Sequence, residues 1–394
     1  MSIIWLLLLS GSAFSIFLML QPAITLPSRP ITYGSYAATA TLFGGGIIIF
    51  ICFVLNKWIL LPNWVMYSAM LIATLSSILH THFLQRRQLY ARAGFEYILL
   101  AILVIATLLA TMTAIGIILA IATEAIYFFQ YISITDFLFG TVWSPQIAIR
   151  ADQVAAHGAF GVIPLITGTF MITAIAMLVA TPTGIIIATY LSEFAPKRIR
   201  TNIKPVLELL AGVPTVVYGF FAVVILSPIL HDLGLTIGIQ IASESALAAG
   251  MVMGVMLIPF ITSLSEDALF AVPDTLRQGA LALGSTPFET AFKVAIPSAL
   301  PGIISSILLA LSRAIGETMI VVMAAGISAT LTVNPLEAVT TITVQIVTLL
   351  TGDQEFNDPK TLAAFALGLI LFITTLTLNL FSLRIIRRYQ QSYE

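Results

Sequence analysis

The stretch ALAAGMVMGVMLIPFITSLSEDA (246–268) carries no charged residue before Glu266. An α-helix needs about 20 predominantly apolar residues to cross the hydrocarbon core of a bilayer, so this stretch predicts a transmembrane helix. It is followed by AVPDTLRQGALALGSTPFETAFKVAIPSALPG (271–302), a more polar segment with its own helix signals. Together the two stretches predict a helix that crosses the membrane and a folded loop at its end.

The composition extends this prediction to the whole chain. Of 394 residues, 59% are hydrophobic and only 9% are Asp, Glu, Lys or Arg. A soluble surface needs roughly 25–35% charged residues, so this chain cannot cover itself against water. The same figures exclude a disordered chain, a collagen and a coiled coil. A net charge of −1 gives no indication of nucleic-acid binding, and the single cysteine, Cys52, gives no disulfide or metal signature.

Nine stretches are apolar enough to be transmembrane helices: 3–20, 37–55, 64–80, 97–122, 161–188, 206–230, 246–268, 301–326 and 362–383. We interpret 3–20 as a retained helix and not as a signal peptide, because no Lys or Arg precedes it and no clear cleavage site follows it. The sequence therefore predicts an all-α polytopic membrane protein.

Basic residues predict the orientation, because Lys and Arg in short loops stay on the cytoplasmic side. With the N-terminus outside and nine alternating helices, most basic residues fall in cytoplasmic loops, while the outer loops retain only Lys57, Arg150 and Lys360. We therefore expect a cytoplasmic C-terminus. The outer segment 123–160 is rich in aromatic residues, as is typical of a segment at the membrane interface.

The loop 271–302 predicts two short helices joined by a glycine turn. Pro273 starts the first helix, and Gly284 supplies a left-handed C-cap. Thr286 caps the second helix, and Glu289 closes a capping box back onto it. We expect Pro297 and Pro301 to end the second helix.

Both predicted helices of this loop have an apolar face, formed by Leu276, Ala280 and Leu283 in the first and by Phe288, Phe292 and Ala295 in the second. A rigid apolar knob in the cytosol is costly to leave bare. It either docks onto a partner protein or rests on the membrane interface, and these residues leave both readings open.

The same loop resembles the EAA loop of ABC-transporter permeases in Gln278-Gly279-Ala280, Gly284 and Ile296-Pro297. In that family the loop docks into a groove of the ATP-binding subunit, so the resemblance implies that these six residues couple the chain to an ATPase. The family usually has Glu-Ala-Ala where this chain has Gln-Gly-Ala. Gln278 keeps the hydrogen bonding of a glutamate but not its charge, so it cannot form a salt bridge with the ATPase.

Four further segments are DFLFGTVWSPQ (136–146), YLSEFAPKRIR (190–200), KPVLELLAGVPTVVYGFF (204–221) and LSRAIGETM (311–319). Together they resemble the PstC-type permeases of phosphate-specific ABC importers, over about residues 89–394. The resemblance implies a type I ABC-importer permease core of six transmembrane helices in 89–394, with a coupling loop at 271–302. The N-terminal membrane extension 1–88 would add two or three helices before it.

The resemblance also implies an assembly in the bacterial cytoplasmic (inner) membrane. Its members would be this chain, a second PstA-like permease, two PstB-like ATP-binding subunits and an extracytoplasmic PstS-like phosphate-binding protein, all in contact with membrane lipid where they cross it.

Arg313 and Glu317 lie in the middle third of the predicted span 301–326. An ionised side chain near the bilayer centre costs roughly 2.5–3.5 kcal/mol. Spaced i, i+4, the two should share one helix face and neutralise each other. They form either a structural ion pair or a transport-pathway site, in which Arg313 offers a forked donor to a passing oxyanion. In PstC-like chains this segment is associated with transport, which favours the pathway.

Other charges near helix ends receive simpler interpretations. We expect Glu208 to pair with Lys204, and Glu266 and Asp267 to be solvated helix-end charges.

Two pairs of residues predict helix breaks at membrane depth, namely Pro182 with Gly184 and Gly212 with Pro214. The polar side chains near them either line a pathway or pack between helices: Thr167, Thr169, Thr215 and Tyr218.

The chain contains no Gly-Lys pair and therefore no P-loop for ATP. We expect no enzyme, no catalytic residue, no metal and no cofactor, and ATP hydrolysis by a partner subunit. The expected function is a permease subunit that translocates inorganic phosphate. The alternatives are a permease for another oxyanion such as sulfate or molybdate, an ion-coupled secondary transporter, and a membrane scaffold or sensor.

Overall fold

The computed structural model describes residues 91–145, 159–351 and 358–390. The predicted helices 3–20, 37–55 and 64–80 lie outside the described residues. The chain divides into two compact units, Met1–Ile117 and Ile118–Glu394. The first helix of the described part crosses this boundary, and the candidate site described below lies in the second unit.

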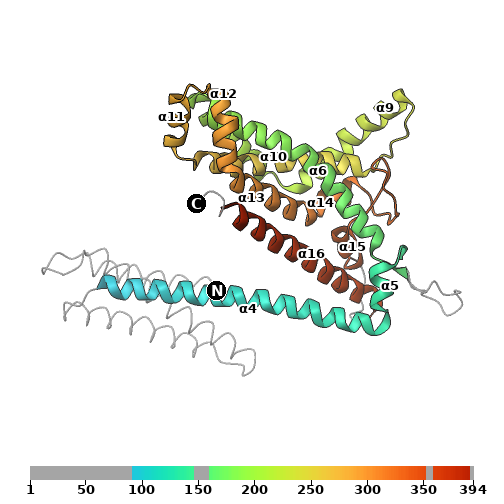
Figure 1. Cartoon of the computed structure of the whole chain (residues 1–394). Coiled ribbons are helices and arrows are strands. Elements are labelled where there is room, and N and C mark those ends of the chain that lie inside the picture. Colours follow the sequence, from blue (N-terminus) through green and yellow to red (C-terminus); the bar gives the residue numbers. More distant parts are fainter. Residues whose placement is uncertain (1–90, 146–158, 352–357, 391–394) are drawn as a thin grey trace, which may run out of the picture. The chain divides into compact units, whose positions relative to one another are not determined.

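Most of the described residues are helical (Figure 1). The α-helices are α4 (Ala91–Tyr131), α5 (Ile134–Phe139), α6 (Ile163–Thr189), α7 (Lys197–Gly212), α8 (Thr215–Phe221), α9 (Ser227–Ile237), α10 (Ala246–Phe270), α11 (Asp274–Ala282), α12 (Pro287–Thr290), α13 (Ile296–Ile315), α14 (Met319–Ala324), α15 (Ile342–Leu349) and α16 (Pro359–Gln390). Three π turns accompany them: η1 (Tyr190–Phe194) follows α6, η2 (Ala222–Leu226) joins α8 to α9, and η3 (Ala291–Ala295) joins α12 to α13. The strands β1 (Trp143–Ser144) and β2 (Ala159–Phe160) pair antiparallel, Trp143 opposite Phe160.

Six helical segments of the described part are long and apolar enough to cross a bilayer. They are Leu99–Tyr131, Ile163–Phe194, Thr215–Ile237, Ala246–Phe270, Pro287–Ile315 and Pro359–Arg384. The expected core of six transmembrane helices is thus confirmed for the described part of the chain. Two spans are shifted from their predicted ranges: 206–230 begins later, after the break at Pro214, and 301–326 begins earlier and ends at Ile315.

Helices α6 and α10 pack closely because glycines remove side chains from their contact. A Cβ atom at Gly250 would lie 2.7 Å from the Ile175 side chain, and one at Gly254 would lie 2.8 Å from that of Val179. Gly184 meets Ile261 in the same way, at 2.8 Å. Small residues that let helix backbones approach are the usual means of association in membranes, so α6 and α10 form the rigid centre of the second unit.

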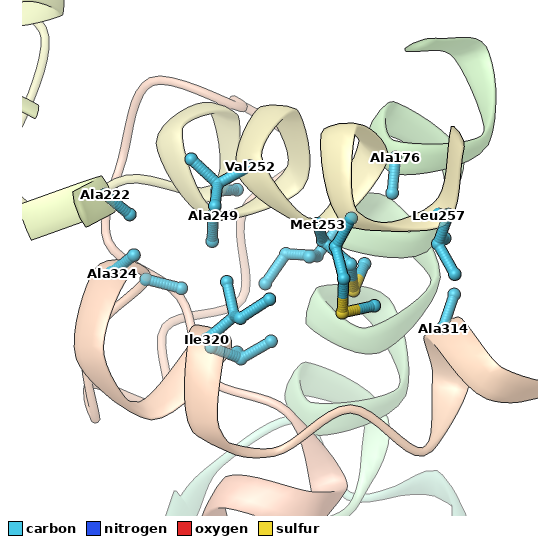
Figure 2. Packing of buried hydrophobic residues seen from close by; sticks show 14 of the residues in the cluster. Ala176, Ala222, Ala249, Val252, Met253, Leu257, Ala314, Ile320 and Ala324 are labelled. Atoms are coloured by element: carbon cyan, nitrogen blue, oxygen red, sulfur yellow. The ribbon is translucent and has the colours of Figure 1, made fainter. Parts of the chain in front are cut away.

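The main apolar core surrounds α10. Figure 2 shows Ala249, Val252 and Met253 of α10 facing Ile320 and Ala324 of α14, while Leu257 points toward Ala314 at the end of α13. All of these side chains are buried. The core therefore joins α10 to the segment that carries Arg313 and Glu317.

A second core lies at the far end of this unit from α11 and α12, near α5 and α15 (Figure 1). The aromatic rings of Phe128, Phe137 and Phe160 meet edge to face there, with centroids 5.1 and 5.6 Å from that of Phe128. Trp143 packs on Phe160, and its indole Nε1 donates a hydrogen bond of 2.9 Å to the side-chain oxygen of Gln345 in α15. The aromatic segment is therefore folded into the protein and does not only lie at a membrane surface.

Each π turn is followed by a proline two residues after its end: Pro196 after η1, Pro228 after η2 and Pro297 after η3. In an α-helix, Pro297 would clash with the carbonyl of the residue four positions earlier and could not donate to it. The wider π turn avoids the clash, because the Ile296 N–H donates to the carbonyl of Ala291, five residues back.

The prediction that Pro297 and Pro301 end the second loop helix is therefore wrong. Both lie inside α13, and one helical segment continues from Pro287 to Ile315. The predicted break at Pro182 is also wrong, because α6 runs through it. The break at Gly212 and Pro214 is confirmed, since α7 ends at Gly212 and α8 begins after Pro214.

Candidate functional site

The loop between α10 and α13 forms the predicted knob, which we define as residues 274–295. Gly284 has a φ of +92°, as the left-handed C-cap requires. Thr286 accepts a hydrogen bond from the Glu289 N–H, and the Glu289 carboxylate accepts one of 3.1 Å from the Thr286 N–H. The capping box predicted from the sequence is confirmed.

Much of the apolar surface of this knob is exposed. Leu283, next to Gly284 in the chain, is 90% exposed, and Leu276 and Phe288 are exposed as well. Phe288 and Phe292 stack with ring centroids 4.5 Å apart. The knob thus presents a preformed apolar surface, as a docking element would.

The six residues predicted to couple to an ATPase divide into two groups. Gln278, Gly279 and Gly284 are exposed, and nothing lies within 4 Å of a Cβ atom built on either glycine. Ala280, Ile296 and Pro297 are half-buried, the last two at the start of α13. The exposed group can meet a partner, whereas the half-buried group joins the knob to the membrane helix.

Arg277 anchors the knob to the rest of the chain. Its Nε and Nη2 donate to the two carboxylate oxygens of Glu193 in η1, at 3.2 and 2.9 Å. Nη2 also donates to the carbonyl of Leu269 at 2.7 Å, and Nη1 to that of Val272 at 2.6 Å and to Asp274 at 3.2 Å. These contacts use all five N–H donors of the guanidinium. The hydrogen bonds to Glu193, opposed by partial burial, raise the pKa of Arg277 above its ordinary value, so the cation persists at any physiological pH.

A second charge cluster joins α7 to α10. The carboxylate of Glu266 is 1% exposed and accepts a hydrogen bond of 2.7 Å from Arg200 Nε, with Lys204 Nζ at 3.7 Å. Arg200 also lies over the Phe270 ring, 4.5 Å from its centroid. Glu266 is therefore not the solvated helix-end charge that the sequence predicted. Its two cations come from α7, sixty-odd residues earlier in the chain, where no local pattern could reveal them.

The structure also shows the surroundings of two nearby carboxylates, Asp267 and Glu208. Asp267 is exposed, as predicted, although Lys204 Nζ donates to it at 3.4 Å. The predicted pair of Lys204 with Glu208 is not formed, because Lys204 turns toward α10 and Glu208 is exposed.

Arg313 and Glu317 do not form the expected pair. Helix α13 ends at Ile315, so the two residues do not share a helix face. Glu317 lies in the break before α14, where its carboxylate accepts a hydrogen bond of 3.1 Å from the Met319 N–H. A free helix N-terminus attracts a carboxylate, and this local capping replaces the i, i+4 ion pair.

Arg313 is exposed, and its guanidinium lies over the ring of Phe260 in α10, 5.6 Å from the centroid. Within the described part of the chain, no ion pair neutralises it. The neighbouring Ser312 donates a hydrogen bond of 2.7 Å to Asn379 in α16. A forked cation held by an aromatic face, with a polar pair beside it, can bind an oxyanion weakly and release it.

The polar side chains near the breaks satisfy backbone groups. The Tyr218 hydroxyl donates at 2.9 Å to the carbonyl of Leu210, across the break at Pro214. Thr169 donates to the carbonyl of Leu165 and accepts from the Ile342 N–H. Thr167 bonds to the Ile163 carbonyl. These contacts favour the packing role over the pathway role for all three, and Thr215 is half-buried with no such contact described.

A cavity of about 370 Å³ opens between α6, α13, α15 and α16. Thr169, Thr374 and Thr377 are its polar residues, and the rest of its lining is apolar: Ile166, Phe170, Ile315, Ile342, Leu371, Ile373 and Leu378. Without a charged side chain, this cavity does not suit an oxyanion. Among the described residues, no group of His, Cys, Asp and Glu could hold a metal ion either.

Comparison with known proteins agrees with this geometry. The family described as "Binding-protein-dependent transport system inner membrane component" matches residues 180–393. The probable ABC transporter permease protein YqgH of Bacillus subtilis (strain 168) is 32% identical over 266 residues, or 68% of this chain and 82% of that protein. The phosphate transport system permease protein PstC of Mesorhizobium japonicum is 35% identical over 231 residues, or 55% of this chain and 70% of that protein.

A solved structure is similar in fold. A chain in the crystal structure of a bacterial alginate ABC transporter, in complex with its alginate pentasaccharide-bound periplasmic protein, aligns with a TM-score of 0.52. The alignment covers 75% of this chain and 97% of that chain, at 18% identity. At this identity the likeness concerns the fold alone.

Proposed function

Because the chain belongs to the family of binding-protein-dependent transport system inner membrane components, we propose that it is the permease subunit of an ATP-driven importer of inorganic phosphate. Coupling to an ATPase is supported by the exposed knob, which Arg277 holds rigidly at the end of two membrane helices. The substrate is proposed from the phosphate permeases among the relatives. A secondary transporter would have no use for such a knob.

We place the permease domain at residues 89–394 and a membrane extension at 1–88. The chain pairs with a second PstA-like permease, rests on two PstB-like ATP-binding subunits and receives phosphate from a PstS-like binding protein outside the cell. The knob and the C-terminus face the cytoplasm, where the ATPase is. Hydrolysis belongs to that partner, since the sequence contains no P-loop.

In this proposal, ATP binding closes the two ATPase subunits and moves the knob through its exposed residues Gln278, Gly279 and Gly284. The second helix of the knob continues into the membrane as the helical segment Pro287–Ile315, which includes the π turn η3. Arg313 lies at the far end of that segment, just before the break after Ile315. A movement of the segment would therefore move the Arg313 guanidinium into or out of the transport pathway. Glu317 acts beside it by holding the N-terminus of α14.

The test is phosphate uptake by the complete complex in proteoliposomes that contain ATP. Arg313→Gln should lower uptake at least tenfold and leave the yield of assembled complex unchanged. Arg313→Lys should be intermediate, because it keeps the charge but loses the fork. Arg384→Gln, at an exposed position of α16, is the matched control and should transport normally.

Normal uptake by Arg313→Gln would contradict the pathway role of Arg313. Uptake of sulfate or molybdate in preference to phosphate by the unaltered complex would contradict the proposed substrate, and phosphate uptake without any ATPase would contradict the importer.

A further inference from the structure

Arg277 and Glu193 form the link between the knob and the end of α6. Glu193 is 9% exposed and Arg277 is 18% exposed. Their contact is bidentate, with donor–acceptor distances of 2.9 and 3.2 Å. Bidentate contacts between Arg and a carboxylate fix orientation as well as distance, so η1 and α11 are held at one mutual angle.

The same guanidinium also holds the end of α10 through the carbonyl of Leu269, and the turn after it through that of Val272. The side chains of these two residues are buried in a small apolar cluster with Ala188 of α6 and with Ala299 and Ile303 of α13. Arg277 is thus bonded to the backbone of a cluster in which three membrane helices meet. One side chain therefore connects α11 to the place where all three helices meet.

A second contact joins the same parts more loosely. Phe194 of η1 faces Phe288 of α12 with ring centroids 6.4 Å apart. The two rings are exposed, whereas the Arg277–Glu193 contact is largely buried. The ionic contact is therefore the stiffer of the two connections.

We propose that Arg277, with Glu193, is the positioning pair that transmits the movement of the knob to α6, α10 and α13. This inference rests on the proposed function and adds the residues that carry its mechanical step. It makes a distinct prediction: without the pair, the ATPase still docks onto the exposed surface of the knob and hydrolyses ATP, but the membrane helices no longer follow.

The experiment measures the number of phosphate ions imported per ATP hydrolysed, for the complete complex in proteoliposomes. Arg277→Gln and Glu193→Gln should each lower this ratio at least fivefold, while co-purification of the ATPase and its rate of hydrolysis stay within twofold of the unaltered complex. The double variant should be no worse than either single variant, because the two residues act as one unit. Arg277→Lys should fall between, since an ammonium cannot make the forked contact.

The matched control is Lys293→Gln, which removes an exposed ion pair with Glu289 on the same knob and should leave the ratio unchanged. A ratio within twofold of normal in Glu193→Gln would overturn the proposal. So would a loss of ATPase co-purification in that variant, because the pair would then serve docking and not transmission.

A readout that is independent of substrate separates this inference from the proposed function. In a Cys52→Ser background, a cysteine introduced at Thr318, in the break after α13, is labelled with a maleimide before and after trapping with ATP and vanadate. The labelling rate should change on trapping in the parent complex and not in Arg277→Gln or Glu193→Gln. If the parent complex imports no phosphate, the substrate is wrong, yet this labelling difference would still support the pair; an equal change in parent and variants would overturn it.

Discussion

Glu266 is a carboxylate inside the protein whose two cations come from a different helix. Its burial would be unfavourable without them, because a buried charge must be paired and hydrogen-bonded. Arg200 meets this requirement with a hydrogen bond and keeps its own side chain 27% exposed. The residue therefore holds α7, which has no buried side chain of its own, against the end of α10.

Replacing Glu266 by Gln should destabilise the protein. Removing one partner of a buried ion pair costs about 3–5 kcal/mol, and the exposure of Arg200 puts the expected loss near the lower figure. In detergent, the midpoint of thermal unfolding should fall by at least about 5 °C. Asp267→Asn, at an exposed position next to it, should shift the midpoint by no more than about 1 °C, and equal shifts for the two variants would contradict the assignment.

For single residues, the sequence shows where charged side chains lie along the chain but not which residues they pair with. Arg313 and Glu317 were expected to pair because they are four residues apart, but Gly316 weakens the helix between them and the Glu317 side chain caps the next helix instead. The partners of Glu266 and Arg277 are distant in sequence, and only the packing of α6, α7 and α10 brings them together. Nothing in the sequence distinguishes Arg277 from the other basic residues of the predicted cytoplasmic loops.

The knob is the element for which local signals sufficed. Its glycine turn, N-cap and capping box were all predicted, because each depends on residues at most three positions apart. The π turns were not predicted, since Pro297 reads as a helix end when only the local rule is applied. Inside a membrane protein, however, a helix can continue past a proline, because a local π turn and neighbouring helices satisfy the backbone groups that the proline leaves unpaired.

Gly284→Val should alter the knob through the backbone alone. Nothing lies within 4 Å of a Cβ atom at this position, so no clash is involved. At a φ of +92° a side chain costs about 1–2 kcal/mol, most for a β-branched residue. We expect co-purification of the ATPase to fall at least threefold.

Two further variants serve as controls for Gly284→Val. Gly284→Asn should have a milder effect, because Asn tolerates the left-handed conformation, and Ser285→Ala in the same turn should have none. If Gly284→Val recovers as much ATPase as the unaltered chain, the shape of this turn does not matter for docking.

For the whole molecule, the sequence predicted the membrane-spanning core but not all of its limits. Composition alone indicated a membrane protein, and six spans of the described part follow. The limits of two spans were wrong because they depend on breaks at Pro214 and Gly316, whose backbone groups are satisfied by Tyr218 and Glu317. Such contacts cannot be read from hydropathy.

The proposed orientation can be checked with single cysteines in a Cys52→Ser background. Leu283, in the knob, and Thr141, next to β1, are both exposed. A membrane-impermeant maleimide should label Thr141→Cys in cells whose cytoplasmic membrane is intact, and Leu283→Cys only after that membrane is permeabilised. The reverse pattern would place the knob outside and contradict an ATPase partner in the cytoplasm.

The π turns η2 and η3 also set the rotational orientation of the helices that follow them directly, α9 and α13. Each holds one residue more than an α-helical path would, and one residue corresponds to about 100° of rotation. The one in η3 decides that Ile303, Ser306 and Ala310 of α13 face the protein interior. Without that added residue, the same sequence would turn these side chains toward lipid and swing the start of the break, with Arg313, onto another face. Pro228 and Pro297, which follow these two π turns, thus fix which faces of α9 and α13 point into the transmembrane core.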